Sequence, residues 1–541
     1  MFIKVTKSGK YEYAQLVRSY REKGVVKQEV LLNLGRLDQI ANNPSIQRLA
    51  IRLQELSGLK NRVDLSSFSE AQIVNWGYIV YEKIWKMFEL DKILTQIQEK
   101  RKIQFPLNEA CFLMVIQHLL EPRSKLGTYH HQNRYFNLPP VELHHLYRSL
   151  DILCDHKEEL EERIFHKQRS LFNMQVDVVF YDVTTLSFES VRADSLRDFG
   201  FSKDGKFKEV QVVLGLLIDC AGRPVGYELF PGNTFDGKTL EAALDKLEKR
   251  FGIRRVIIVA DRGVNSKLNL KRITDRNYGY IFAARLKNMG KEVEEQIFNP
   301  EGYLELDSPP EEEVRYKVVD YLNSFRKEGK TYELKEKLII TYSSTRAKKD
   351  REDRERLLEK AQLLLQNQSK ITASNKRGGK KYLKNISKET WYLDEEALHR
   401  DEKFDGYYGI QTSEEDIKPQ DALEAYHTLW KIEESFRIMK STLEVRPIFH
   451  WTENRIKGHL VICFLAFLLE RTLEFKLQES EEKASPEEIR EALNSLNFAE
   501  VEIENQQFLL KIKGTELSNK ILKLFKIKPP KNITPKEELS L

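Results

Sequence analysis

Residues 176–190 read VDVVFYDVTTLSFES, and this stretch decides how the middle of the chain folds. β-branched and aromatic residues dominate it, and apolar residues alternate around Asp182, so the pattern predicts a β-strand. Two similar stretches follow at 209–219 and 224–232, separated by turn-forming residues. We therefore expect three consecutive antiparallel strands.

The next segments alternate between helix and strand. A helix predicted to begin at Asp236 leads into the apolar strand RVIIVAD at 255–261, and a helix from about Ser266 leads into a strand at 280–285. The order β-β-β-α-β-α-β joins three antiparallel strands to parallel ones through a crossover helix. It predicts an α/β protein with a ribonuclease-H-like core.

Two aspartates fall at one edge of this predicted sheet. Asp182 lies within the first strand, and Asp261 ends the buried strand, where open α/β sheets carry ligand-binding and catalytic groups. The two strands are neighbours in this strand order, so we expect the two carboxylates to lie close together. Asp219 is a rival second aspartate, but it begins the turn sequence DCAGRP and is interpreted as a turn former.

A third carboxylate, Glu433, lies in a predicted amphipathic helix that includes YHTLWKIEESFRIMK at 426–440. Apolar residues recur along one face at three- and four-residue steps: Ala425, Leu429, Ile432, Phe436, Met439 and Leu443. A second row lies beside it: Tyr426, Trp430, Glu433, Arg437 and Lys440. We expect the apolar face to dock on the sheet and the second row to face the strand ends. Trp430 is interpreted as a core aromatic, and Glu434 as solvated.

Three converging carboxylates would repel one another unless a cation neutralised them. Oxygen ligands of this kind suit Mg²⁺ or Mn²⁺. A pair of such ions, roughly 3.5–4 Å apart, can deprotonate an attacking hydroxyl and stabilise a leaving oxygen at phosphorus. We therefore predict that Asp182, Asp261 and Glu433 hold two divalent ions. This chemistry needs no protein nucleophile, which agrees with the lack of a Ser–His or Cys–His constellation in the sequence.

The charge distribution suits a polyanionic partner. The net charge is only +5, but residues 1–64 carry twelve Lys or Arg and six Asp or Glu. Residues 510–541 carry eight Lys and three Glu. Basic ends favour nucleic acid, and a solvated basic tail is the alternative.

Cysteine usage and hydropathy favour a cytoplasmic protein. The four cysteines are far apart and none forms a C-x-x-C pair, so we expect buried thiols and no zinc site. The N-terminus lacks the apolar core of a signal peptide, and the longest apolar run, around HLVICFLAFLLE, is too short for a membrane span. We expect no membrane partner.

Changes in sequence pattern divide the chain into regions. The predicted regions are a β-rich N-terminal region at 1–65, a helical DNA-binding region at 66–170, the first part of the core at 171–286, a β-rich insertion domain at 287–404, the second part of the core at 405–475, and a C-terminal region at 476–541 that is a candidate for dimerisation.

Several segments together resemble the DDE transposases of bacterial insertion sequences. They are YDVTTLSFES, GNTFDGKTL, VADRGVNS and Y-x2-L-W-x-I-E-x2-F-x3-K. The closest resemblance is to the group that has a Y-x2-R-x3-E-x6-K signature and a β-rich insertion before the catalytic Glu. The stretch YEYAQLVRSYREKGVVKQEVLLNLGR at 11–36 also resembles one branch of that group. The resemblance covers roughly residues 1–475.

The resemblance implies metal-dependent cut-and-paste DNA transposition. It matches Asp182, Asp261 and Glu433 to the catalytic metal-binding triad, and Tyr426 and Lys440 to residues that contact the DNA backbone near the scissile phosphate. The implied partners are double-stranded DNA, both the terminal inverted repeats of the element and the target, and a second copy of the chain in the DNA complex.

This chain departs from the signature at one position, because the signature Arg falls at Leu429. Arg437 lies one turn after Glu433, and an i,i+4 pair between them is feasible. We hypothesise that Arg437 supplies part of the missing function by presenting its guanidinium to a DNA phosphate.

Relatives that cleave through a DNA hairpin have an aromatic residue in the insertion that captures a flipped base. Trp391 is the candidate here, and an ordinary core tryptophan is the alternative reading. Two other function classes stay open at the level of sequence: a ribonuclease-H-like nuclease that does not transpose, and an inactive DNA-binding relic of a transposase.

Overall fold

The computed structural model describes residues 1–40, 43–57, 71–172, 178–200, 208–253, 256–261, 263–306, 312–366, 371, 378–387, 390–445, 448–503 and 506–539. The chain forms two compact units. The smaller comprises Met1–Gln72, Ala499–Leu510 and Lys531–Ser540, and the larger contains Ile73–Phe498 and Lys511–Pro530.

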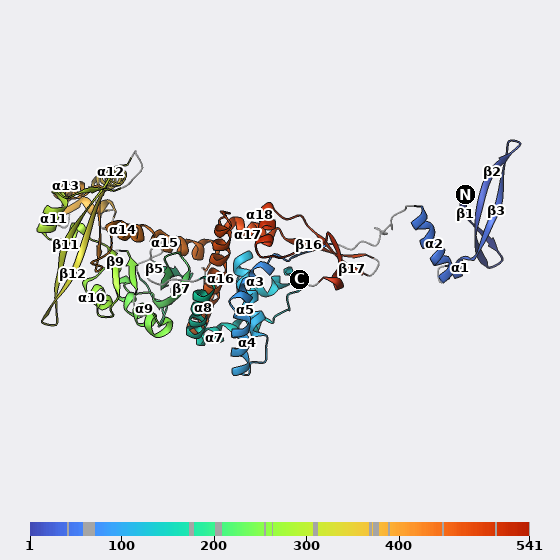
Figure 1. Ribbon diagram of the computed structural model, residues 1–541, viewed down its shortest axis with the longest axis horizontal. Helices are drawn as coiled ribbons and strands as arrows, with labels where there is room; N and C mark the ends of the chain where they lie inside the picture. The colour runs from blue at the N-terminus through green and yellow to red at the C-terminus, as the bar shows by residue number, and fades with distance from the viewer. Residues whose placement is uncertain are drawn as a thin grey trace. The chain divides into compact units, whose positions relative to one another are not determined.

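The smaller unit begins with the antiparallel sheet β1-β2-β3. Its strands are β1 (Phe2–Ser8), β2 (Tyr11–Glu22) and β3 (Val25–Arg36), as the sequence predicts (Figure 1). Gly9 and Gly24 have positive φ at the two connecting turns, a conformation that glycine adopts without strain. Two helices follow, α1 (Leu37–Ile40) and α2 (Pro44–Leu56). Strands β16 (Asn497–Ile503), β17 (Gln506–Lys511) and β18 (Ile533–Pro535) lie next to one another in another sheet.

The larger unit is built on a mixed sheet with the order β10-β11-β12-β15-β9-β8-β5-β6-β7. The half that corresponds to the first part of the predicted core contains β5 (Val178–Ser187), β6 (Gln211–Asp219), β7 (Pro224–Pro231), β8 (Ile257–Ala260) and β9 (Gly279–Ala283). β5, β6 and β7 are antiparallel, whereas β5, β8 and β9 are parallel. The crossover helices are α9 (Asp236–Phe251) and α10 (Lys267–Thr274). The α/β class and the predicted strand order are therefore confirmed.

The sequence led us to expect a β-rich insertion domain. Part of this insertion does not fold apart but joins the sheet. Its strands β10 (Leu304–Glu305), β11 (Val314–Lys327) and β12 (Lys330–Ser343) extend the sheet beyond β15 (Tyr407–Thr412), which pairs with β9. An edge strand exposes unpaired N–H and C=O groups. Pairing with β12 satisfies those groups on β15.

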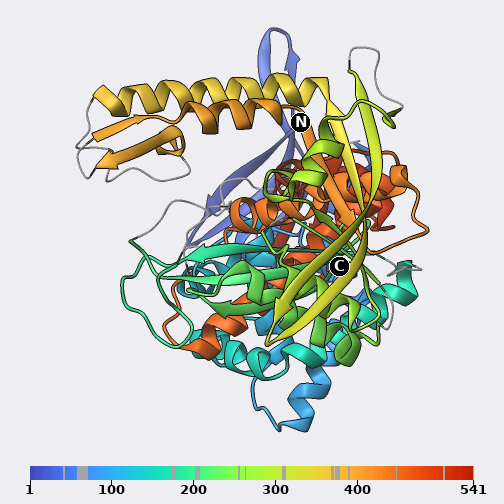
Figure 2. The same cartoon turned by 90° about the vertical axis from the view of Figure 1, so that its left-hand side faces the viewer.

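The rest of the insertion forms a small module of its own (Figure 2). It contains the short helix η5 (Gly379–Tyr382). Helix α11 (Lys291–Phe298) also belongs to the insertion but lies outside this module. The module's longer elements are α12 (Ser344–Gln366), β13 (Leu383–Ser387), β14 (Thr390–Leu393) and α13 (Glu395–Lys403). Ala361, Ile371, Tyr382 and Leu383 form its buried core.

The helical region before the sheet is completed by helices from the other end of the chain. It contains α3 (Ile79–Met87), α4 (Leu90–Lys100), α5 (Leu107–Leu120), α6 (Lys125–His131), α7 (Leu143–Asp155) and α8 (Lys157–Phe172). Of these, α3, α5 and α7 pack against α16 (Glu453–Glu479), with α17 (Pro486–Asn494) and α18 (Glu516–Leu524) alongside. α5 and α16 are buried on nearly every side, which explains their unusually apolar sequences.

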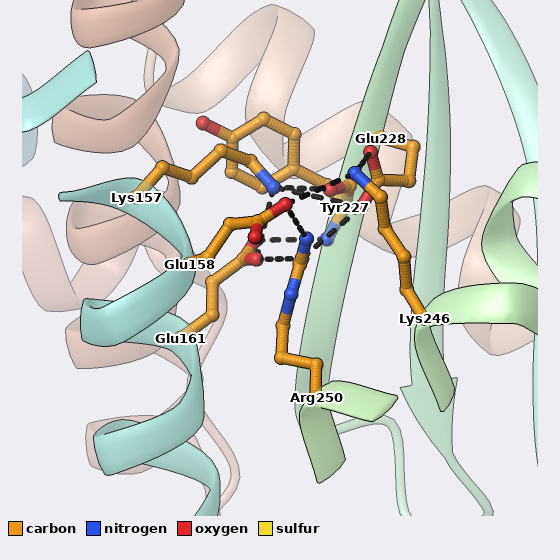
Figure 3. Close-up of polar contacts among 7 residues, drawn as sticks. All are labelled: Lys157, Glu158, Glu161, Tyr227, Glu228, Lys246 and Arg250. Carbon is orange, nitrogen blue, oxygen red and sulfur yellow. Dashed lines mark hydrogen bonds and ion pairs between the residues drawn. The ribbon is translucent and has the colours of Figure 1, made fainter. Parts of the chain in front are cut away.

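A buried ionic cluster joins α8 to the sheet (Figure 3). We call it the balanced cluster: Lys157, Glu158, Glu161, Glu228, Lys246 and Arg250. Arg250 of α9 pairs with Glu161 and Glu158 of α8, and its guanidinium lies 3.1 Å from Glu228 of β7. The cluster fixes the helical region against the sheet.

Candidate active site

Parallel pairing places two of the predicted carboxylates at the same level of the sheet. Tyr181 of β5 is the register partner of Ala260 of β8, so Asp182 and Asp261 are the next residues on adjacent strands. Both side chains are partly exposed and line a cavity of about 1350 Å³. Carboxylate oxygens that share a cavity at a strand end are a suitable donor set for a hard divalent cation.

Glu433 lies on a separate short helix rather than on one long helix with Tyr426. α14 (Pro419–His427) ends before a tight turn, and α15 (Trp430–Arg437) carries Glu433. Backbone bonds of the i→i+3 type link the two, including Leu429 N to Tyr426 O at 3.0 Å. α15 packs against β5, the strand of Asp182. Glu433 is exposed on α15 and is not among the residues that line the cavity.

The other signature residues lie on both sides of this break. Tyr426 is half-buried at the end of α14 and lines the same cavity as the two aspartates. Lys440 is half-buried in a π-helical turn, Ile438–Thr442. Such turns are rare and occur frequently at functional sites. Leu429 is buried, so the position where the signature has Arg faces the interior in this chain.

Three predictions about α15 are wrong. Trp430, predicted to be a core aromatic, is 54% exposed. Glu434, predicted to be solvated, pairs with the buried Arg471 at 3.3 Å. Arg437 is directed to Glu434 at 3.7 Å, an i,i+3 pair, rather than to Glu433. Arg471 of α16 reaches Glu434 and partly covers that side of α15, whereas the side of Trp430 is open.

The insertion supplies the opposite wall of the cavity. Lys287 and Lys381 both line it, and both donate to Asp401, Lys287 at 2.7 Å. Burial alone would raise the pKa of Asp401, but the hydrogen bonds from these two lysines and from Tyr382 lower it to about 2. Asp401 therefore stays ionised and holds two cations at the cavity wall.

The sequence did not lead us to predict Lys287 and Lys381 at the cavity, although a signal for Lys287 existed. Arg285 and Lys287 follow directly after β9, at the same edge of the sheet as Asp261. The rule that selects the carboxyl ends of parallel strands therefore also selects them. Lys381 carried no comparable signal, because only the folding of the insertion brings it to the cavity.

Trp391 lies on β14, opposite Asn385 of β13. Its ring is half-buried and packs against the small core of the insertion, with Lys380 Nζ 5.2 Å from the ring centroid. This placement agrees with the reading of Trp391 as a core tryptophan. It leaves part of the ring accessible for stacking.

Asp219, the rival second aspartate, is a turn former as predicted. Its Oδ1 accepts a hydrogen bond from the Arg223 backbone N–H at 2.7 Å, and its backbone carbonyl accepts one from Gly222 N–H at 3.0 Å. It is buried, which raises its pKa despite these bonds.

Asp182, Asp261 and Glu433 are not within ligand distance of one common point. Within the described ranges, the group whose ligand atoms all lie within 4.8 Å of one another is His118, His459 and Cys463. The two histidines contact the backbone carbonyls of Leu443 and Val445 at 3.1 and 3.2 Å. Lys125 Nζ lies 3.2 Å from the other ring nitrogen of His118. A lysine amine there competes with any metal ion, so we interpret this group as a hydrogen-bonded core network.

Comparison with protein families identifies the class of the protein. Residues 175–469 match the transposase DDE domain, and residues 3–61 match the N-terminal domain of IS1634 family transposases. The first match covers more than half of the chain, which therefore belongs to the DDE transposase family. It is a transposase, an enzyme that cleaves and joins DNA strands, and its family depends on divalent metal ions.

Two solved structures are similar over part of their length. One is a piggyBac transposase synaptic complex with hairpin DNA, with 9% identity, a TM-score of 0.36, and coverage of 79% of this chain and 83% of that one. The other is a Mos1 transposase paired-end complex with the left transposon end, with 12% identity, a TM-score of 0.15, and coverage of 32% and 57%. No curated protein matches the sequence. Throughout the described part of the chain, every helix falls short of the length or apolarity that a membrane span requires.

Proposed function

We propose that Asp182, Asp261 and Glu433 form the catalytic centre, which cleaves DNA at the ends of an insertion sequence and joins the freed end to target DNA. The observation that carries the proposal is the parallel register of β5 and β8. It sets Asp182 and Asp261 on adjacent strands inside one cavity. Glu433 belongs to the helix that packs on β5.

The three carboxylates are the proposed ligands of two Mg²⁺ or Mn²⁺ ions. Their oxygens are hard donors, and like charges hold bare carboxylates apart. When bound, the ions would lower the pKa of the attacking hydroxyl and offset charge at the leaving oxygen. Because Glu433 lies on a helix of its own, its position relative to the two aspartates depends on how α15 packs on β5.

The DNA is proposed to lie across the cavity mouth. Tyr426 would contact the backbone of the cleaved strand from the cavity rim, and Lys440 would neutralise a phosphate from the π-turn. Arg437, exposed on the same face of α15 as Glu433, would bind a further phosphate in place of the signature Arg. Trp391 would stack on an extruded base only if cleavage passes through a hairpin.

End recognition is proposed for residues 1–170, and the active form is proposed to be a homodimer that holds two element ends. The basic character of the N-terminal region supports a DNA contact there. A variant that lacks residues 1–57, which belong to the smaller unit, keeps α3–α8 in place and should lose preference for its own ends in a competition binding assay. Selective binding by the shortened protein would refute this part of the proposal.

The catalytic assignment is tested by conservative substitution. Asp182→Asn, Asp261→Asn and Glu433→Gln should each abolish strand cleavage, while binding to element-end DNA persists, because each loses one metal-ligand charge. Cleavage products separated on denaturing gels provide the measurement and also reveal any hairpin intermediate. Wild-type cleavage by any one of the three variants would show that its residue is not a ligand. Cleavage without strand transfer by the unaltered protein would instead favour a nuclease.

A further inference from the structure

The backbone hydrogen bonds within the short helix α15 do not determine its orientation relative to its neighbours. It spans eight residues between the tight turn at Thr428 and Leu429 and the π-helical turn that starts at Ile438. Its buried face contributes Ile432 and Phe436 to the core. Apolar contacts of this kind are non-directional, so they leave rotation about the helix axis weakly defined.

Two polar contacts hold α15 on another side. Lys431 Nζ donates a hydrogen bond to the backbone carbonyl of Cys220 at 2.9 Å. Glu434 Oε2 lies 3.3 Å from Nη1 of Arg471 on α16. Lys431 and Glu434 are three residues apart and share one side of the helix. They connect α15 to two different neighbours, the β6–β7 turn and α16.

These two neighbours meet at Gly222. This glycine has φ +96°, and a Cβ there would lie 2.9 Å from Arg471 Nη2 and 3.8 Å from Lys431 Cβ. The guanidinium of Arg223 lies 4.7 Å from the ring centroid of Phe475 on α16. The turn, α15 and α16 are therefore packed against one another at one point, where only glycine fits.

Arg471 is itself held firmly. Its side chain is 5% exposed and pairs with Glu474, one turn further along α16. A buried guanidinium with two carboxylate partners has little freedom to move. Its contact with Glu434 is therefore a fixed reference point for α15.

We propose that Lys431, Glu434 and Arg471 form a clamp that sets the rotation of α15 and thereby the position of Glu433 relative to Asp182 and Asp261. All three are positioning residues, and the proposal rests on the proposed catalytic role of Glu433. Side chains reach about 5–6 Å from a helix axis. A rotation of about 10° therefore moves the Glu433 carboxylate by about 1 Å, a displacement large enough to affect catalysis strongly.

The test uses two substitutions with opposite charge changes. Glu434→Gln removes a negative charge near Glu433, and Lys431→Met removes a positive one. Simple electrostatics predicts that the first weakens divalent-ion binding and the second strengthens it. The clamp predicts that both weaken it. The measurement is Mn²⁺ binding, followed by the electron paramagnetic resonance signal of free Mn²⁺, with the protein bound to DNA of its own element ends.

We expect both variants to bind Mn²⁺ at least threefold more weakly and to cleave at least fivefold more slowly, with melting temperatures close to wild type. Lys431→Arg should recover most of the binding. The matched control is Glu228→Gln, which removes a carboxylate partner of Arg250 in the balanced cluster. That cluster has no member on α15. Glu228→Gln should lower the melting temperature and leave Mn²⁺ affinity unchanged.

Each outcome separates the clamp from the catalytic assignment. If Lys431→Met binds Mn²⁺ as tightly as wild type or more tightly, the clamp is wrong, while loss of binding in Glu433→Gln keeps the assignment. If Glu433→Gln retains both Mn²⁺ affinity and cleavage, the catalytic assignment itself fails. If Glu228→Gln weakens Mn²⁺ binding as much as Glu434→Gln does, the effect is general destabilisation and the clamp is refuted.

Discussion

Two ionic clusters join elements of the larger unit, and they differ in how completely their charges are satisfied. In the balanced cluster, both carboxylate oxygens of Glu161 have partners: Tyr227 N–H at 3.2 Å on one, and Lys157 and Arg250 on the other. The acidic cluster consists of Glu434, Glu470, Arg471 and Glu474. There, Glu470 Oε1, Glu474 Oε1 and Arg471 Nε have no hydrogen-bond partner among the described residues.

Burial raises the pKa of carboxyls in both clusters. Burial raises the pKa of Glu470 to about 8, and repulsion from Glu474 adds to this effect. Burial likewise raises the pKa of Glu474 to about 7. Burial also raises the pKa of Glu161, although Lys157 and Arg250 oppose it. The charges of the balanced cluster, which joins α8 to the sheet, are well paired, whereas the acidic cluster beside α15 retains unpaired groups. Unpaired buried groups concentrate where function imposes constraints that stability alone would not.

The largest effect is expected when the balanced cluster loses its central cation. Arg250 is 5% exposed, and Arg250→Ala would leave Glu161 and Glu228 with fewer cationic partners in a buried site. We expect the free energy of unfolding to fall by about 3–5 kcal/mol. Urea denaturation followed by circular dichroism measures this. A loss below about 1 kcal/mol would mean that the cluster is solvated and that the contrast between the two clusters is false.

The acidic cluster should make stability depend on pH in the opposite way to ordinary paired carboxylates. Glu470 and Glu474 bind their protons more tightly in the folded state than the usual pKa of 4.5 allows. Their contribution is therefore fully present below about pH 4.5 and is lost as the pH rises through about 7 to 8. Glu470→Gln, which keeps a neutral side chain, should raise stability by about 2 kcal/mol at pH 9 and change it little at pH 5.

Melting temperatures of wild type and Glu470→Gln between pH 5 and 9 measure this effect. Two curves that stay parallel across the range would show that Glu470 does not titrate in the folded protein. Glu228→Gln, in the balanced cluster, is the control, and it should lower the melting temperature at both ends of the range.

Substitution of Arg437 tests whether this exposed neighbour of the acidic cluster contributes to DNA cleavage rather than to folding stability. It is 73% exposed, and its pair with Glu434 is therefore worth little to folding. Arg437→Ala should lower cleavage at least tenfold, about 1.4 kcal/mol in barrier, with little change in melting temperature. Arg437→Lys should recover only part, because an ammonium lacks the bidentate fork. Normal cleavage by Arg437→Ala would shift the phosphate contact to another cation, Lys440 first.

The smallest effect is expected at the rim of the balanced cluster. Glu158 pairs with Arg250 and Lys246 but is 69% exposed. Glu158→Ala should cost less than about 1 kcal/mol in unfolding free energy, because solvent screens an exposed pair. The same urea titration as for Arg250→Ala gives the comparison. A cost equal to that of Arg250→Ala would contradict the view that burial decides which members of the cluster matter.

Local sequence pattern was sufficient for strands β5–β9 of the sheet and for the positions of two carboxylates on them. Asp182 and Asp261 are flanked by strand-forming residues, and the order of strands and helices leaves few ways to pair them. The turn role of Asp219 also follows from its immediate neighbours. Each of these inferences needs only residues close in sequence and the general rules of strand pairing.

The same reasoning failed where a second element decides exposure. Trp430 was interpreted as a core aromatic and periodicity placed Glu434 in solvent, but Trp430 is 54% exposed and Glu434 pairs with Arg471 of α16. The pattern also ran through Thr428 and Leu429 as one helix, because i→i+3 and i→i+4 bonds suit the same residues. Nothing in the amino-acid sequence of the insertion indicates that β12 pairs with β15 and extends the sheet.

The sequence by itself thus determined the fold class, the strand order and the position of Asp182 and Asp261, because alternation, turns and crossover rules are local properties. Only the tertiary structure decided which face of α15 is covered, how Arg471 reaches Glu434, and which insertion residues line the cavity. Those features depend on contacts between segments far apart in the chain. Their energies come from burial and charge pairing at the meeting point, which no single segment encodes.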